Sequence, residues 1–137
     1  GTNLSSCNLF VNLAGGVRAK EAHSLDMAVA AAVLSARYSV PVLPGSLFVG
    51  EIGLTGEVRS VSNAATRVIE AARLGFRKVF VPASDTAAAL QVIKSGAAEY
   101  PEFEVIGIDT VAAMVNTCFE KPLSITKPRR AVRQASA

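Results

Sequence analysis

The chain has 137 residues, half of them apolar, with 14 Lys and Arg against 11 Asp and Glu. This length suits about one domain with a sizeable core, and the composition argues against a disordered or fibrous chain. Residues 121–137 hold five bases and no acid, which leaves residues 1–120 with a formal charge of −2. The net charge of +3 therefore describes a basic end and not a uniformly basic protein.

The sequence shows neither an apolar run of the ~18 residues that a membrane span needs nor a secretory signal. Cys7 and Cys118 are too few and too far apart for a disulfide framework or a zinc site. We therefore expect no metal site and no membrane partner. The expected compartment is a reducing one: the cytoplasm, or an organelle matrix or stroma if the source is a eukaryote.

The first half of the chain alternates strand and helix signals. Residues 8–13 (NLFVNL) predict a strand, and Gly15 and Gly16 predict a bend after it. A helix that is apolar nearly all round is expected from Ser24 to Leu34, and such a helix should be buried. Residues 47–52 (LFVGEI) then predict a strand that continues through a glycine turn, 53–56, into residues 57–61 as a hairpin.

The second half continues the same alternation. Ser62 is expected to cap an amphipathic helix over residues 63–74, which Gly75 ends, and a strand follows over residues 76–81. Ser84 or Asp85 is expected to cap a helix to about Ser95. A strand over residues 103–108 precedes a last helix, which Asp109 caps and which runs to Phe119. Residues 121–137 lack periodicity, so we expect a domain over 1–120 and a basic, disordered tail over 121–137.

Ser24, His23 and Asp26 are the three residue types of a catalytic triad, and they lie within four positions. His23 is badly placed to activate Ser24, because consecutive side chains point apart on a strand or at a helix end. Asp26 is explained by the helix dipole, which favours negative charge in the first turn. Local evidence therefore favours Ser24 as a helix N-cap, a role worth ~1 kcal/mol.

A longer match suggests a family. Residues 50–82 (GEIGLTGEVRSVSNAATRVIEAARLGFRKVFVP), with LFVNLAGGVR (9–18) and SLDMAVAAAVLS (24–35), resemble the C-terminal Lon-protease-like domain of the RadA (Sms) family of bacterial DNA repair proteins. The strong match covers about residues 9–82. The resemblance implies an α+β, Lon protease-like (ribosomal protein S5 domain 2-like) fold, with helices packed on a mixed sheet. Family members have further strands and a helix before this match, so we expect a domain lacking its N-terminal part, with an unpaired sheet edge.

True Lon proteases use a Ser–Lys dyad. On the aligned residues the serine falls on Ser24 and the lysine falls on Ala65, and residues 50–77 contain no lysine. A methyl group cannot accept the proton that an attacking serine must lose. The resemblance therefore implies that this chain is not an enzyme, with Ser24 and Ala65 as vestigial dyad positions. The enzyme alternative is a serine peptidase that uses Ser24 with another base, such as Lys20.

The resemblance also implies a hexameric, ATP-driven DNA motor that promotes branch migration during recombination. In that family this domain serves ring assembly, as a homo-oligomer, and DNA contact. The phosphate-loop pattern Gly-x-x-x-x-Gly-Lys-Ser/Thr and Cys-x-x-Cys pairs do not occur in this sequence. ATP, Mg²⁺ and Zn²⁺ are therefore expected only in other domains of such a parent protein.

Contact with DNA needs Lys and Arg that neutralise phosphates, which gives salt-dependent and sequence-independent binding. The family pattern has a basic residue at Arg18 and Arg59, and local charge adds further candidates; the full set is Arg18, Lys20, Arg59, Arg67 and Arg73. The simpler interpretation is that these are ordinary solvated charges, since Arg67 and Arg73 flank Glu70 at helical spacing. Aromatic stacking platforms are not evident in the sequence. A pure assembly module without DNA contact is therefore a third hypothesis.

Overall fold

The computed structural model describes residues 4, 7–12, 19–96 and 100–124. Three strands form a parallel sheet in the order β1 (Ser46–Phe48), β4 (Lys78–Pro82) and β5 (Glu104–Ile108). Two others, β2 (Glu51–Ile52) and β3 (Val58–Arg59), pair antiparallel as a separate hairpin. The α+β class is confirmed, and the parallel and antiparallel pairings lie in two sheets instead of one mixed sheet.

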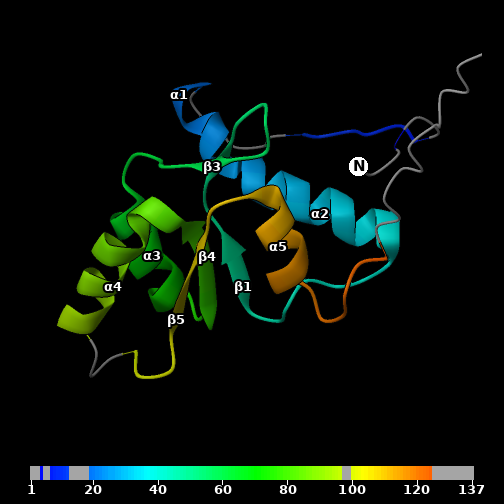
Figure 1. Ribbon diagram of the computed structural model, residues 1–137. Coiled ribbons are helices and arrows are strands. Elements are labelled where there is room, and N and C mark those ends of the chain that lie inside the picture. Colours follow the sequence, from blue (N-terminus) through cyan, green and yellow to red (C-terminus); the bar gives the residue numbers. More distant parts are fainter. Residues whose placement is uncertain (1–3, 5–6, 13–18, 97–99, 125–137) are drawn as a thin grey trace, which may run out of the picture.

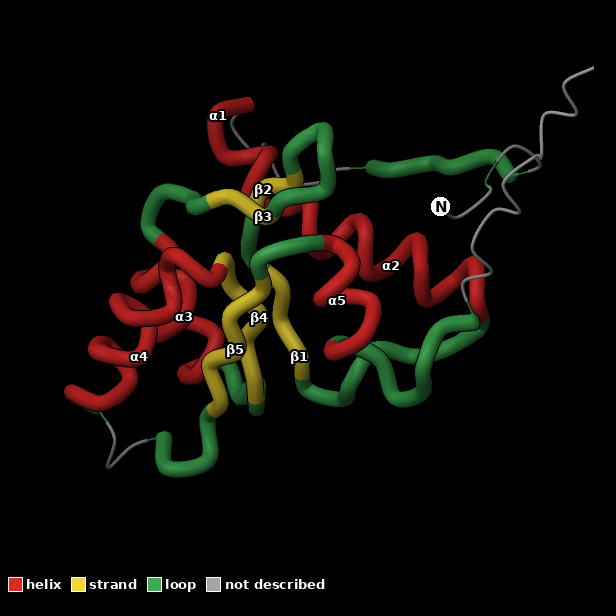
Figure 2. The backbone as a smooth tube through the Cα atoms, in the orientation of Figure 1, coloured by secondary structure: helices red, strands yellow, loops and turns green. Residues whose placement is uncertain are grey.

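Helices cover both faces of the parallel sheet (Figures 1 and 2). On one side lie α3 (Ala64–Arg73) and α4 (Thr86–Ser95), and on the other lie α2 (Asp26–Tyr38) and α5 (Val111–Thr117). The central strand β4 packs against the helices on both faces of the sheet. Val79 and Val81 pack with α3 and α4, and Phe80 packs with α2 and α5. All three side chains are fully buried, as expected for a parallel strand covered on both faces.

The core includes one residue of the segment that the sequence analysis assigns to the tail (121–137). Leu123 is buried in the same cluster as Cys118 and Phe119, next to α2 and α5. Residues 125–137 lie outside the described part of the chain, so their disorder stays a prediction. None of the helices in the described ranges has the length and apolarity that a bilayer crossing requires.

The N-terminus of the buried helix differs from the sequence prediction. A short helix, α1 (Ala19–Ala22), and one 3₁₀ turn, η1 (His23–Leu25), precede α2, which begins at Asp26. Ser24 caps no helix: its hydroxyl donates to the carbonyl of Glu21, 2.6 Å away. The N-cap prediction was wrong because the chain is already helical before Ser24, so the hydroxyl bonds back to the preceding turn.

Two other capping predictions were also wrong. Asn63, and not Ser62, directly precedes α3, and it has a left-handed backbone (φ 60°) without a side-chain cap. Thr110, and not Asp109, caps α5, because its Oγ1 accepts a hydrogen bond from the Ala113 amide at 3.1 Å. Gly75 does end α3 as predicted, with a φ of 86° that suits glycine.

The predicted strand over residues 47–52 divides at Gly50 between the two sheets. Gly50 exchanges backbone hydrogen bonds with the start of the buried helix, donating to the Ser24 carbonyl (3.0 Å) and accepting from the Met27 amide (3.2 Å). A Cβ at Gly50 would come within 2.4 Å of the Met27 sulfur. The chain therefore leaves the parallel sheet here because it passes directly against α2.

The N-terminal segment, residues 7–12, is not a strand. Residues 8–12 are exposed and pair with no other strand among the described residues, and Leu13 lies outside those residues. The strand prediction therefore fails over 8–12, because a strand needs a hydrogen-bonded neighbour.

The hairpin prediction is confirmed. Gly56, with a φ of 90°, donates to the Gly53 carbonyl and closes the turn between β2 and β3. Glu57 organises this turn by accepting hydrogen bonds from the Thr55 hydroxyl and amide and from Arg59. Bonds from Thr55, from its own backbone and from Arg59 lower the pKa of Glu57 to about 2.

Replacing Thr110 with Ala should lower the free energy of unfolding by ~1 kcal/mol, because an N-cap hydroxyl is lost. Thr117→Ala is the matched control, since Thr117 is an exposed threonine of the same helix whose hydroxyl donates to the Ala113 carbonyl and does not cap α5. Urea unfolding of both variants measures the difference. Equal losses, or a larger loss for Thr117→Ala, would contradict the assignment of the cap.

The lowered pKa of Glu57 predicts a pH dependence of stability. Its carboxylate stabilises the folded hairpin fully above the usual pKa of 4.5, and this stabilisation is lost as the pH falls towards about 2. Glu57→Gln cannot titrate, so its melting temperature should fall less than that of the wild type between pH 5 and pH 2. Glu102→Gln, at an exposed position, is the control. Parallel curves for wild type and Glu57→Gln would contradict the assignment.

Candidate functional site

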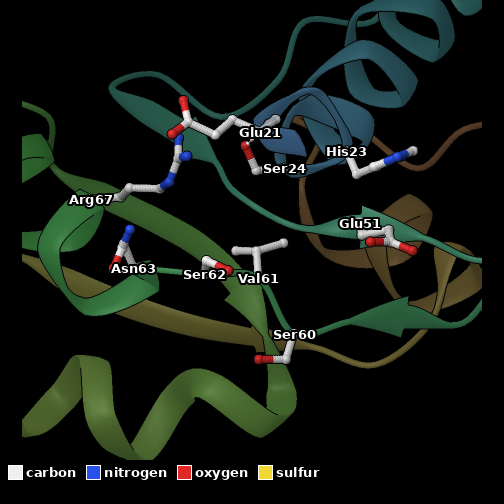
Figure 3. A pocket seen from close by; sticks show the side chains of 9 residues that line it. All are labelled: Glu21, His23, Ser24, Glu51, Ser60, Val61, Ser62, Asn63 and Arg67. Atoms are coloured by element: carbon white, nitrogen blue, oxygen red, sulfur yellow. Dashed lines mark hydrogen bonds between the residues drawn. The ribbon is translucent and has the colours of Figure 1, made fainter. Parts of the chain in front are cut away.

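A pocket of about 260 Å³ lies between the short helical turns before α2 and the loop that leads into α3 (Figure 3). One wall comes from α1 and η1, and the other comes from the end of the hairpin, the loop over 60–63 and the first turn of α3. The residues that line it are Glu21, His23, Ser24, Glu51, Ser60, Val61, Ser62, Asn63 and Arg67. This pocket contains Ser24, the serine singled out by the sequence.

Ser24 is 6% exposed, and its hydroxyl proton is directed at the Glu21 carbonyl. His23 extends away from Ser24 in Figure 3, as expected for consecutive side chains. Within the described residues, the Ser24 hydroxyl makes one hydrogen bond, to the Glu21 carbonyl. The hydroxyl therefore acts as a donor inside a helical turn, and no basic side chain whose contacts the structure describes accepts its proton.

The second dyad segment faces the same pocket. Asn63 and Arg67, two residues on either side of Ala65, line the pocket together with Ser24. Ala65 is half-buried on α3 and does not line the pocket. The two segments that carry the dyad in the resemblance thus meet in space, and the side chain at position 65 has no atom that accepts a proton.

Two aspartates hold the pocket wall in place. Asp26 Oδ2 accepts a hydrogen bond from the Ile52 amide at 3.2 Å, which ties β2 to the start of α2. Asp85 accepts from the Ser60 hydroxyl and, at 3.2 Å, from the Val61 amide, although it also precedes α4. Neither Ser84 nor Asp85 forms a side-chain cap on α4. Sequence reasoning missed these roles because all three bonds join segments far apart in the chain.

The candidate DNA-contacting arginines on the surface have acidic partners. Arg59 is paired with Glu57 and, at 3.5 Å, with Glu51. Its pKa is raised, first by the hydrogen bond to Glu57. Arg73 lies 2.7 Å from Glu70, and hydrogen bonds to Tyr100 and Glu70 raise its pKa. Both guanidinium groups are more than half exposed, so they stay accessible while their charges are largely compensated.

Arg67 is not the ordinary solvated charge that the simpler interpretation of the sequence predicts. Its side chain is half-buried in the pocket, and its Nε is buried and has no hydrogen-bond partner among the residues that the structure describes. Arg67 and Arg73 lie about 9 Å apart along the helix axis, from a rise of 1.5 Å per residue. Arg18 and the side chain of Lys20 lie outside the described part of the chain, so the five predicted residues are not brought into one observed surface.

Aromatic side chains gather at the opposite end of the parallel sheet. Phe76, Tyr100 and Phe103 line a groove of about 240 Å³ together with Arg77 and Glu102. Phe76 is far in the sequence from Tyr100 and Phe103, so no local pattern could have indicated the groove.

Burial raises the pKa of the Cys118 thiol to about 12, which makes it unreactive. The described residues contain no group of three or more His, Cys, Asp or Glu placed to hold a metal ion.

Comparison with known proteins identifies relatives of this chain. The family model described as subunit ChlI of Mg-chelatase matches residues 1–85. The DNA repair protein RadA of Streptococcus pyogenes serotype M1 is 40% identical over 120 residues, which cover 87% of this chain and 24% of that protein. RadA of Bacillus subtilis (strain 168) is 36% identical over 117 residues, 85% of this chain and 24% of that protein.

A shorter alignment matches another RadA protein. RadA of Rickettsia typhi is 44% identical over 79 residues, which cover 58% of this chain and 18% of that protein. The chain thus spans about a quarter or less of the length of these curated relatives. It belongs to the family described as subunit ChlI of Mg-chelatase, and it is homologous to a segment of the bacterial DNA repair protein RadA.

Proposed function

We propose that this chain is a non-catalytic, Lon-like domain with an S5 domain 2-like fold, belonging to a RadA-type DNA repair and recombination protein of the cytoplasm or of an organelle. It serves ring assembly, as a hexamer, and contact with DNA, whereas ATP-driven branch migration belongs to the whole protein. The observation that carries the proposal is the 40% identity to a DNA repair protein RadA over 87% of the chain.

Two features support the absence of peptidase activity. The Ser24 proton is directed at a backbone carbonyl, and the position that a dyad lysine would occupy holds Ala65. The carboxylates in the pocket do not replace the lysine: Glu51 is paired with Arg59, and Glu21 meets Ser24 through its backbone carbonyl. A hydroxyl without an adjacent base is a weak nucleophile.

Self-association is supported by exposed apolar side chains in the N-terminal segment. Leu9, Phe10 and Val11 are 59%, 91% and 55% exposed. A run of three exposed apolar residues is unusual for a monomer. This exposed run and the homology to RadA support the proposed ring assembly.

Contact with DNA is supported by the homology and by the accessible guanidinium groups of Arg59 and Arg73. The proposed set also includes Arg18 and Lys20, which the family pattern and the local charge indicate. We exclude Arg67 from this set, because its half-buried side chain lines the pocket. The ion pairs of Arg59 and Arg73 favour a second candidate function, an assembly module without DNA contact.

A fluorophosphonate probe should label neither the wild-type chain nor Ser24→Ala, since Ser24 lacks an activating base. The readout is in-gel fluorescence after incubation, with trypsin as the control for probe reactivity. Labelling of the wild type that is lost in Ser24→Ala would support the peptidase hypothesis and overturn the non-catalytic one.

Fluorescence anisotropy should show weak DNA binding by the assembled chain that falls steeply with salt, because released counterions drive it. Arg59→Ala should weaken binding to all sequences alike and reduce the salt slope by about 1. Lys94→Ala, at an exposed position outside the proposed set, is the matched control. Undetectable or salt-independent binding by the assembled wild type would favour the assembly module instead.

A further inference from the structure

The aromatic groove forms where two neighbouring strands of the parallel sheet begin. Lys78 and Glu104 are the first residues of β4 and β5 and lie opposite each other, so the segments that precede them run side by side. Phe76 comes from the first segment, and Tyr100 and Phe103 come from the second. The fold thus builds an aromatic surface, although the sequence alone shows no stacking platform.

Backbone hydrogen bonds fix the position of the groove. The Phe76 amide donates to the Ala71 carbonyl of α3 at 3.1 Å. The Arg77 amide donates to the Gly45 carbonyl (2.9 Å), and the Arg77 carbonyl accepts from the Glu104 amide (3.0 Å). The groove is therefore held in place before a ligand arrives, which lowers the entropy that binding costs.

The rings of the groove are partly exposed. Tyr100 and Phe103 also pack against the core between the sheet and α3, whereas Phe76 belongs to neither core cluster of the described residues. The groove lies on the α3 side of the sheet, and the N-terminal segment 7–12 runs beside α2 on the other side (Figures 1 and 2). Phe76 can therefore be replaced without opening the core.

Charged groups of both signs border the rings. Arg77 and Glu102 line the groove and are exposed, and within the described part of the chain neither forms an ion pair. Arg73, one of the proposed DNA contacts, adjoins the groove through its hydrogen bond to Tyr100. A nucleotide complements this set, because its phosphate attracts arginine, its base stacks on aromatic rings and the amino group of cytosine donates to a carboxylate.

We propose that this groove binds one nucleotide of single-stranded DNA, with the base stacked on Phe76, the phosphate at Arg77 and a cytosine amino group at Glu102. This inference rests on the DNA contact proposed above and names the form of DNA that the domain prefers. A base inside a duplex must be unpaired and unstacked before it can enter such a groove, which costs free energy. The groove therefore selects single strands over duplexes.

A tryptophan at position 76 reports on the base directly. The chain contains no tryptophan, so Phe76→Trp supplies a single fluorophore whose emission should fall when a base stacks on it. A single strand of mixed sequence should quench this emission at low salt, whereas an abasic strand of the same length and the matching duplex should not. Leu54→Trp, at the fully exposed hairpin turn, is the matched control and should not respond to any strand.

Fluorescence anisotropy with labelled strands measures what each side chain contributes. Phe76→Ala should weaken single-strand binding about tenfold, and Phe76→Trp should retain it. Arg77→Gln should reduce the salt slope by about 0.7. The wild type should bind oligo(dC) more tightly than oligo(dT), and Glu102→Ala should remove this preference, because thymine has an acceptor in place of the amino group. Urea unfolding checks that each variant is folded.

The outcomes separate the groove from the proposed function. Single-strand binding that Phe76→Ala leaves unchanged, or equal quenching by the abasic strand, would overturn the groove and leave DNA contact by other arginines standing. A wild type that binds no DNA would overturn both. Equal affinities of the wild type for oligo(dC) and oligo(dT) would overturn the role of Glu102. Quenching by a polyproline peptide and not by DNA would assign the groove to a proline-rich protein instead, since such peptides also dock in aromatic-lined grooves.

Discussion

The structure depends on one constraint, the burial of β4 on both faces between two helical layers. Val79, Phe80 and Val81 are completely buried, so the strand needs apolar cover on each side and hydrogen-bonding neighbours at each edge. Val49 donates to Phe80 and carries the chain from β1 towards the pocket. At the far end of β5, Val58 donates to Asp109 and Val111 donates to Gly56. The hairpin is therefore anchored at the carboxyl ends of β1 and β5, and its position sets the wall of the pocket.

The pocket brings together the two segments that carry the dyad in the resemblance. Ser24 and the first turn of α3 meet there, as the dyad alignment requires of the two segments, yet the Ser24 hydroxyl is used inside its own helical turn. Asp26 and Asp85 use their carboxylates to hold the hairpin and the loop over 60–63. Ser24 and Asp26, two of the residues that look catalytic in the sequence, thus bond to backbone groups of the fold.

The ion pairs of the surface arginines are exposed and therefore weak. Arg59 and Arg73 each have a carboxylate partner within 4 Å, and exposed pairs of this kind contribute little to stability. They can therefore exchange a carboxylate for a phosphate at small cost. The exposed side chains of Leu9, Phe10 and Val11 carry no charge to pair, so they gain free energy only through burial.

The sequence by itself determined the helix and strand order after the start of α2, the hairpin at Gly53 and Gly56, the helix end at Gly75 and the presence of alanine at position 65. These features depend on local periodicity, on backbone freedom and on the identity of one side chain. Only the tertiary structure decided the roles of Ser24, Asp26 and Asp85, the division of residues 47–52 at Gly50 and the inward orientation of Arg67. A polar side chain bonds whichever group the fold brings nearest, and those groups come from segments that the local sequence does not contain.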